Sequence, residues 1–247
     1  MNKKIYFVSD AHFGAATHAS TLDAERKFCR WLDSIKHDAE AIYLMGDIFD
    51  YWFEYKYVVP KGFTRVLGKI GEITDMGVDV HFFIGNHDLW LTDYLSTECG
   101  MITHVDPLIT EIYGKKFFLA HGDGLGDESK SFHFLRRVFH NKFLRKCFSA
   151  IHPRWTMPLA HSWSARSRRT GEIYNFMGED KEHLIKFSKS KLLQESDINY
   201  FVYGHRHILL DYPLTDSSNV IILGDWITIF SYAEFNGTEM KLKIWED

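Results

Sequence analysis

The chain has 247 residues, of which 45% are hydrophobic and 16% aromatic, enough to bury the core of one globular domain with an inserted subdomain. Its cysteines, Cys29, Cys99 and Cys147, are widely spaced and form no Cys-x-x-Cys pair, which argues against a disulfide framework or a zinc ribbon and fits a reducing cytoplasm. The apolar run after the basic start Met1-Asn2-Lys3-Lys4 is too short for a signal peptide or a membrane span, so we expect a cytoplasmic protein.

The net charge of -4 conceals an uneven distribution along the chain. Residues 130–170 contain ten Lys or Arg and no Asp or Glu, which leaves 19 basic and 33 acidic residues elsewhere. The basic segment favours an anionic ligand. The acidic remainder would repel a long polyanion, so no nucleic-acid partner is expected.

The first half of the chain alternates apolar runs with helical patterns. The run at residues 5–8 predicts a strand buried on both faces, and an amphipathic helix is predicted over residues 21–37. A second strand at 41–45 is followed by a helix over 63–76, and a third strand at 80–84 follows that helix. This alternation predicts an α/β fold with a largely parallel central sheet, in which ligands bind beyond the carboxyl ends of the strands.

Polar clusters stand at the ends of these predicted strands and of two later ones. In chain order they are Asp10-Ala11-His12, Gly46-Asp47, Gly85-Asn86-His87-Asp88, His121-Gly122 after a strand at 115–120, and Gly204-His205-Arg206-His207 after a strand at 198–203. Closing strands are predicted at residues 220–224, 226–230 and 240–245.

A long interruption separates the last two clusters. Residues 124–180 carry apolar side chains at helical spacing, and we expect Pro153 and Pro158 to break them into two arms. The domain prediction is therefore a core of residues 1–123 and 181–247 with an inserted helical cap at 124–180.

The clusters supply seven oxygen or nitrogen donors and no thiolate: Asp10, His12, Asp47, Asn86, His121, His205 and His207. Any one of these histidines alone would more often be a surface or core residue. Together they exceed what a single ion needs, and they suit two adjacent cations that share a carboxylate. Asp47 is the expected bridge, because it follows a glycine at the middle strand and has no paired histidine.

These motifs resemble those of the calcineurin-like metallophosphoesterases. The resemblance implies a four-layer α-β-β-α sandwich. It also implies one metal held by Asp10, His12, Asp47 and His207, and a second held by Asp47, Asn86, His121 and His205. The donors would accept manganese, iron or zinc. We expect two divalent ions, with manganese as the metal.

His87 stands beside the expected ligand Asn86, where it could protonate the leaving oxygen of a phosphoester. Asp50 and Asp88 are candidates for orienting histidines, and Asp88 is counted with His87 as catalytic. The alternative is that both carboxylates only stabilise turns.

The insertion carries a closer resemblance, from His121-Gly122-Asp123-Gly124-Leu125 through the Arg136-Arg137 pair to Ala165-Arg166-Ser167-Arg168. These stretches are similar to the cap of UDP-2,3-diacylglucosamine pyrophosphatases, lipid A pathway enzymes that release UMP and 2,3-diacylglucosamine 1-phosphate. Phe53 lies in an aromatic-rich stretch that this family shares. His87 departs from the family, which commonly has arginine there. The chain either performs the same cleavage with a histidine acid or acts on another lipid-linked or nucleotide pyrophosphate.

The resemblance and the cap's composition together predict the partners. Substrate contacts are expected from Asn86, His87, Arg136, Arg166, Ser167, Arg168 and His205. Apolar residues such as Phe139 and Phe143 would line an acyl groove, and the basic cap would contact the inner-membrane surface. A helical hairpin with an ordinary core and a solvated basic face is the alternative. A general phosphodiesterase, a nucleotide pyrophosphatase and a non-enzymatic scaffold are the rival functions, and the oligomeric state is left open.

Overall fold

The protein is described by a computed structural model covering residues 3–15, 20–126, 138, 141–159, 162 and 175–247. The first sheet and its helices comprise β1 (Lys4–Val8), α1 (Thr21–Ile35), β2 (Ala39–Leu44), α2 (Thr64–Asp75), β3 (Asp79–Phe83), α3 (Tyr94–Cys99), β4 (Ile102–His104), β10 (Ser231–Phe235) and β11 (Met240–Ile244). The remaining elements are β5 (Leu108–Ile112), β6 (Lys115–Leu119), α5 (Lys142–Ser149), α7 (His183–Gln194), β7 (Tyr200–Tyr203), β8 (Leu209–Thr215) and β9 (Ser218–Leu223).

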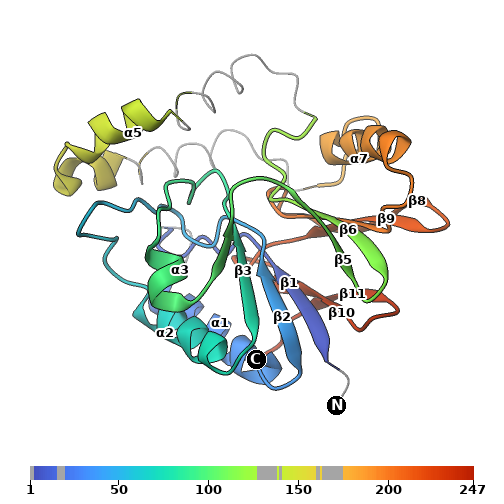
Figure 1. The fold of residues 1–247 in the computed structure, drawn as a ribbon, viewed down its shortest axis with the longest axis horizontal. Coiled ribbons are helices and arrows are strands. Elements are labelled where there is room, and N and C mark those ends of the chain that lie inside the picture. The colour runs from blue at the N-terminus through green and yellow to red at the C-terminus, as the bar shows by residue number, and fades with distance from the viewer. Residues whose placement is uncertain (1–2, 16–19, 127–137, 139–140, 160–161, 163–174) are drawn as a thin grey trace.

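The strands form two sheets that face each other (Figure 1). One has the order β11-β10-β1-β2-β3-β4 and the other β5-β6-β7-β9-β8. The strands that carry the predicted motifs pair in parallel, β1 with β2, β2 with β3 and β6 with β7, while antiparallel strands complete the edges. The α/β class is confirmed. The parallel pairing expected from the alternating runs is found from β1 through β2 and β3 to β4, and these strands belong to one of two sheets. The hydrophobic runs identify the strands without fixing how they are divided between the sheets.

Alternating side chains of the central strands supply separate cores. In β1, Tyr6 and Val8 face α1 and α2, whereas Ile5 and Phe7 enter the apolar layer between the sheets. Phe7 stacks on Phe117 of β6 with ring centroids 5.9 Å apart. A strand buried on both faces is what the continuous apolar run predicts.

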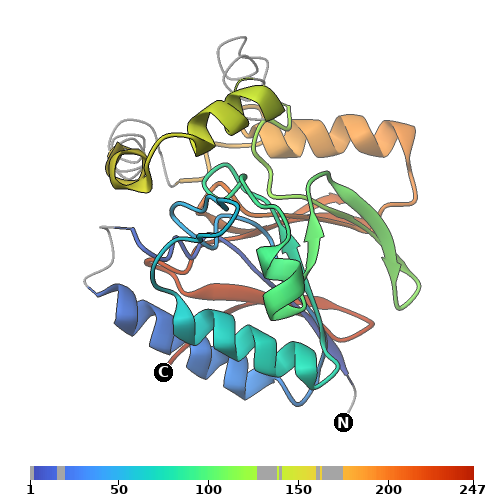
Figure 2. The same ribbon diagram turned by 60° about the vertical axis from the view of Figure 1, so that its left-hand side comes forward.

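Helices cover the outer faces of the two sheets. Figure 2 shows α1 and α2 side by side on one face of the molecule and α7 on the opposite side. Leu184 and Ile185 of α7 are fully buried against the five-stranded sheet, among Phe118, Phe201 and Tyr203. Within the described part of the chain, no helix combines the length and apolar character needed to cross a membrane.

The predicted closing strand at residues 226–230 is wrong. Residues 226–229 form a turn, because the carboxylate of Asp225 accepts hydrogen bonds from the backbone N–H groups of Ile227, Thr228 and Ile229. These amides are therefore satisfied locally and do not join a sheet ladder. The closing strand of this region is β10, which starts at Ser231.

The described part of the insertion contains helical stretches joined to turns and irregular residues. It includes α5 and residues 153–159, which contain both of the prolines that were expected to break the segment. Pro153 occupies the first helical position, where its missing N–H costs nothing. Pro158 is followed by one described helical residue, Leu159, so a break at Pro158 stays a prediction. The boundaries of the cap stay a prediction.

Candidate metal centre

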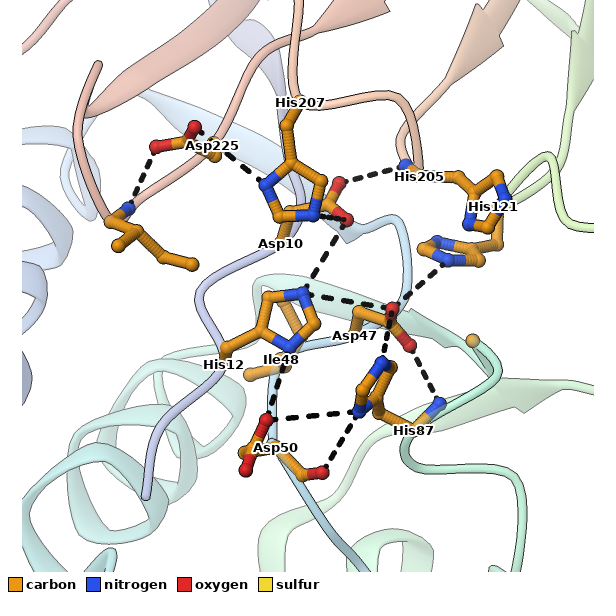
Figure 3. A network of polar contacts seen from close by, with 12 residues as sticks. Asp10, His12, Asp47, Ile48, Asp50, His87, His121, His205, His207 and Asp225 are labelled. Carbon is orange, nitrogen blue, oxygen red and sulfur yellow. Dashed lines mark hydrogen bonds and ion pairs between the residues drawn. The ribbon is translucent and has the colours of Figure 1, made fainter. Parts of the chain in front are cut away.

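The seven expected ligands lie in loops that follow five strands. The loop after β1 carries Asp10 and His12, that after β2 Asp47, that after β3 Asn86, that after β6 His121, and that after β7 His205 and His207. Three of these strands belong to one sheet and two to the other, so the site is assembled where both sheets end. Figure 3 shows the aspartates and histidines converging on one another.

Their ligand atoms form three overlapping groups, each with all atoms within 4.8 Å of one another: Asp10, His12 and His207; His12, Asp47 and His87; Asp47, His121 and His205. In the first group, Nε2 of His207 lies 3.4 Å from Oδ1 of Asp10. The groups share members, so together they form one continuous polar centre.

Asp47 connects the two ends of this centre. Its Oδ2 lies 3.7 Å from Nε2 of His12 on one side and 3.4 Å from Nε2 of His121 on the other. Its Oδ1 accepts the backbone N–H of His87 at 2.9 Å. The carboxylate thus faces both groups of donors, as a ligand shared between two ions must.

Five of the seven expected ligands have left-handed backbones: Asp10 (φ 55°), His12 (φ 44°), Asp47 (φ 52°), His205 (φ 66°) and His207 (φ 50°). Such conformations cost roughly 1–3 kcal/mol each in non-glycine residues and persist only where the surroundings enforce them. Their concentration in these loops shows that the backbone is held so as to turn the side chains inward.

Two glycines let the loops approach closely. A Cβ at Gly85 would lie 2.1 Å from Oδ1 of Asp47, and one at Gly204 would lie 2.6 Å from Oδ2 of Asp10. Any larger residue at either position would displace a carboxylate of the centre. The glycines of these motifs are therefore part of the site's construction.

Buried atoms without hydrogen bonds test whether the centre fits a metal. Oδ1 of Asp10, Nε2 of His12 and Nε2 of His121 are buried, and none has a hydrogen-bond partner among the described residues. Leaving buried polar atoms unpaired is costly and rare. All three face the space between the clustered side chains, so a divalent cation there would satisfy them together. The residues fit the metal.

The centre's charges are strongly coupled. Burial acts to raise the pKa of Asp47, but the adjacent His121, His87 and His12 outweigh it and hold that pKa well below its ordinary range. Burial acts to lower the pKa of His121, and Asp47 raises it well above the ordinary value. Since metals bind neutral imidazole, cation binding here would release protons.

The far nitrogens of three histidines lie near oxygen atoms on the side away from the centre. Nδ1 of His121 lies 2.8 Å from the carbonyl oxygen of Met45, and Nδ1 of His12 lies 3.6 Å from Oδ1 of Asp50. Nδ1 of His207 lies 3.6 Å from Oδ2 of Asp225. This arrangement turns each Nε2 toward the centre, as partners behind metal-binding histidines commonly do.

Asp225 is a site residue that the sequence analysis missed. It is buried, and burial acts to raise its pKa, but the hydrogen bonds from His207 and from three backbone amides lower the pKa to about 2. The signal was present in the sequence: Gly224-Asp225 follows β9 as Gly46-Asp47 follows β2.

His87 faces the centre from one side. Its Nδ1 lies 3.0 Å from the carbonyl oxygen of Asp50, and its Nε2 lies 4.0 Å from Oδ2 of Asp47. Burial lowers the pKa of His87 below its ordinary value. The ligand atoms of His87, His12 and Asp47 lie within 4.8 Å of one another, so His87 also stands where a ligand of an ion could lie.

Asp50 and Asp88, the two carboxylates expected to orient histidines, make different contacts. Asp50 contacts His12, as expected of an orienting residue. Asp88 is fully buried, and its carboxylate accepts backbone N–H groups from Ile48, Phe49 and Gly85, at 2.8, 3.3 and 2.7 Å. Burial raises its pKa to about 7. Through these hydrogen bonds Asp88 connects the loop after β2 to the loop after β3. They match the alternative stated above, in which Asp88 stabilises turns and does not orient a histidine.

The remaining expected contacts are less well placed. Asn86 is exposed in the loop after β3, and the groups above, which consist of carboxylates and histidines only, do not bear on its amide. Arg136, Arg166, Ser167 and Arg168 lie outside the described residues, as does Phe139. Phe143 is 71% exposed on α5.

The described part of the insertion rests on the core near His87. Phe148 of α5 contacts Phe53 and Trp90, with ring centroids 5.1 and 5.0 Å apart. Arg145 donates hydrogen bonds to the carbonyl oxygens of Leu91 and Trp90, at 2.8 and 3.3 Å. Phe53, from the aromatic-rich stretch, therefore joins the insertion to the loops of the centre.

The chain is similar to known proteins over nearly its whole length. The profile of the calcineurin-like phosphoesterases matches residues 3–209. UDP-2,3-diacylglucosamine hydrolase of Porphyromonas gingivalis is 46% identical over 100% of this chain and 99% of its own length. The Edwardsiella ictaluri protein of the same name is 28% identical, covering 90% of this chain and 84% of that one. A solved dimetal phosphatase from Danio rerio aligns with 98% of this chain and 96% of its own, with 16% identity and a TM-score of 0.47.

Proposed function

Because the chain belongs to the calcineurin-like phosphoesterase family, we propose that it cleaves the pyrophosphate of UDP-2,3-diacylglucosamine to UMP and 2,3-diacylglucosamine 1-phosphate in lipid A biosynthesis. Family membership makes it a metal-dependent hydrolase. This choice of substrate is supported by the similarity to the Porphyromonas gingivalis hydrolase, which is 46% identical over 100% of this chain and 99% of its own length.

The proposed centre holds two divalent ions. Asp10, His12, Asp47 and His207 would hold one, and Asp47, Asn86, His121 and His205 the other. The unpaired buried atoms of Asp10, His12 and His121 support this assignment. Carboxylate, imidazole and amide donors without thiolate suit manganese, iron or zinc, and manganese is our proposal. The chemistry that such ions supply when bound is polarisation of phosphoryl oxygens and acidification of water.

The protein itself would supply the proton for the leaving oxygen. Attack at phosphorus develops negative charge on the leaving oxygen, and His87 would deliver a proton to it from Nε2. The Asp50 carbonyl oxygen, 3.0 Å from Nδ1, keeps the ring in this orientation by accepting the Nδ1 proton.

Residues 124–180 are the proposed cap over this centre. Arg136, Arg166, Ser167 and Arg168, with Asn86, His87 and His205, would contact the phosphates and headgroup. Large apolar side chains on the described part are exposed, including Phe143, Trp155 (70%) and Leu159 (65%). Together with the absence of acidic residues from 130–170, this supports contact with an anionic membrane surface from the cytoplasmic side.

The test is product identification with a substrate panel. Purified protein with manganese would be incubated separately with UDP-2,3-diacylglucosamine, UDP-N-acetylglucosamine and bis(p-nitrophenyl) phosphate. The products would be identified by mass spectrometry. We expect UMP and the diacylated sugar phosphate from the first compound, at a much higher kcat/KM than for the other two. Equal turnover of all three would instead indicate a general phosphodiesterase, and preference for the sugar without acyl chains would indicate a nucleotide pyrophosphatase.

A further inference from the structure

Arg206 lies between the two expected ligands of the loop after β7, and its side chain points away from the centre toward a buried carboxylate. Its Nε donates to Oε1 of Glu182 at 3.0 Å and to Oε2 at 3.3 Å, while Nη2 donates to Oε2 at 3.2 Å. Glu182 is 1% exposed. The guanidinium fork thus grips one buried acid, which fixes orientation as well as distance.

Glu182 stands at the start of α7, where an acidic side chain would normally cap the helix. It is the N-cap residue of α7, yet its side chain makes no capping hydrogen bond to that helix. Acidic side chains at helix N-termini are stabilised by the helix dipole and by free N–H groups. Here the carboxylate is turned across to Arg206 instead, with Nδ1 of His183 3.7 Å away.

The loop that Arg206 belongs to is strained. The N–H of Arg206 donates to the carbonyl oxygen of Gly204 at 2.7 Å, which closes a three-residue turn around His205 at φ 66°. His207, one residue beyond, is at φ 50°. Tight turns with a positive central φ are rare and need support from their surroundings.

Support comes from two sides. On the inner side, the N–H of His205 donates to Oδ2 of Asp10 at 2.9 Å. On the outer side, the Glu182 carboxylate holds Arg206, and the Asp225 carboxylate lies 3.6 Å from Nδ1 of His207. The inner support comes from an expected metal ligand, whereas Glu182 and Asp225 are not expected ligands, and Glu182 contacts the residue between the two histidines.

We infer that Glu182 is a positioning residue for the metal centre, which acts through Arg206 to hold His205 and His207 in ligand geometry. The inference rests on the proposed function, because it assigns these histidines to the two ions. It adds a residue from outside the five motifs, at the point where the chain re-enters the core after the insertion.

A different result is expected if the ion pair of Glu182 and Arg206 has only a structural role. A buried ion pair that only joins α7 to the neighbouring loop would contribute to folding, and its loss would leave an unpaired buried charge. Metal affinity in the folded variant would then be unchanged. Metal affinity, rather than stability or activity, therefore separates the two roles.

The experiment titrates Mn²⁺ into the metal-stripped full-length chain and measures free Mn²⁺ by electron paramagnetic resonance. Glu182→Gln and Arg206→Met should each raise the Mn²⁺ concentration for half-loading roughly 10- to 100-fold, the usual effect of losing a partner behind the ligands. The double variant should lose no more than the worse single variant, because the two residues act as one unit. Arg206→Lys keeps the charge without the fork and should fall between wild type and Arg206→Met.

Glu234→Gln is the matched control, because Glu234 is a largely buried acid paired with Lys243 at 2.7 Å on β10, away from the centre. It should bind Mn²⁺ as wild type does. Folded Glu182 and Arg206 variants with wild-type Mn²⁺ affinity, or with a loss no larger than the control's, would overturn the inference. If Arg206→Met does not fold, Arg206→Lys decides by the same criterion. A wild-type chain that binds no Mn²⁺ would contradict the proposed function itself, which is a distinguishable result.

Discussion

Asp225 stands behind His207, with its Oδ2 3.6 Å from Nδ1 of the imidazole, while Nε2 of the same ring lies 3.4 Å from Oδ1 of Asp10. The carboxylate is itself fixed by the amides of the turn at residues 226–229. A local turn therefore sets the direction of a histidine that lies between two carboxylates. This relationship makes Asp225 a determinant of the centre although it does not face the space between the ligands.

Asp225→Asn should keep the turn's hydrogen bonds and weaken metal binding. An amide can still accept the backbone N–H groups, but it cannot hold His207 by charge. We expect a roughly 10- to 100-fold loss of Mn²⁺ affinity, measured by titration of metal-stripped protein. Asp211→Asn, at an exposed carboxylate on β8, is the control. Equal affinities of the two variants would count against the role of Asp225.

Asp47→Asn should reduce activity more than His12→Asn. Asp47 faces both His12 and His121, so its charge offsets both proposed ions, whereas His12 serves one of them. Metal content per chain, measured by elemental analysis, should fall further in the Asp47 variant. Two ions per chain and near-normal turnover in Asp47→Asn would refute the bridge.

His87→Ala should keep the metals and lose roughly 10² to 10⁴ in rate, the range of general-acid catalysis. The loss should shrink for substrates with good leaving groups, because those need no proton. Rates for a series of aryl phosphodiesters would show this. A uniform loss would indicate substrate positioning, and a loss of metal would make His87 a ligand, which its place beside His12 and Asp47 also permits.

A second histidine pair, remote from the ligands in the sequence, should make stability depend on pH. Nδ1 of His81 lies 2.9 Å from Nε2 of His104, and burial together with His104 lowers the pKa of His81 to about 4. The unfolded histidine titrates near 6.5, so between pH 6.5 and 4 the unfolded chain binds more protons. The free energy of unfolding should therefore be highest above pH 6.5 and decline as the pH falls toward 4.

His81→Phe tests this, because the ring can keep its stacking on Tyr43, whose centroid lies 4.3 Å away. The variant should lose less stability than wild type between pH 6.5 and 4, as measured by urea unfolding at several pH values. Titrating groups remote from His81 contribute equally to both chains and cancel in the difference, so the difference reports on the pair of His81 and His104. Parallel curves for the two proteins would rule out the contribution of His81.

Phe143→Ser should alter selectivity if α5 lines an acyl groove. Each buried methylene contributes about 0.8 kcal/mol, so losing the apolar contact should lower kcat/KM for the diacylated substrate much more than for its deacylated analogue. The fold should tolerate the change, because Phe143 is 71% exposed. Leu193→Ser on α7, at an 89% exposed position, is the control. An unchanged ratio of kcat/KM values would separate Phe143 from acyl recognition.

The strand ends could be predicted because a continuous apolar run followed by Gly and Asp or His is a local signal. The apolar runs before Asp10, Asp47 and His121 form the strands β1, β2 and β6. The partition into two sheets could not be predicted from these runs alone, since β1 and β6 have the same pattern but different partners. Pairing depends on contacts far apart in the sequence, which periodicity does not contain.

The residues behind the ligands were harder to predict than the ligands. Asp225 lies in a stretch whose apolar neighbours resemble a strand, and the side-chain hydrogen bonds that make it a turn leave no periodic trace. Glu182 stands outside any motif, and only the fold brings it to Arg206. Asp88 is predicted to orient a histidine, whereas the contacts of its carboxylate are with backbone amides.

The most direct test of a dinuclear centre that cleaves UDP-2,3-diacylglucosamine measures metal occupancy and product release together. Mn²⁺ would be added stepwise to metal-stripped protein in the presence of UDP-2,3-diacylglucosamine, with bound metal and UMP followed in the same samples. We predict that UMP release rises with Mn²⁺ and reaches its maximum only when two ions are bound per chain. Full UMP release from metal-free protein or at one ion per chain, or no UMP at two ions per chain, would contradict a dinuclear hydrolase of this substrate.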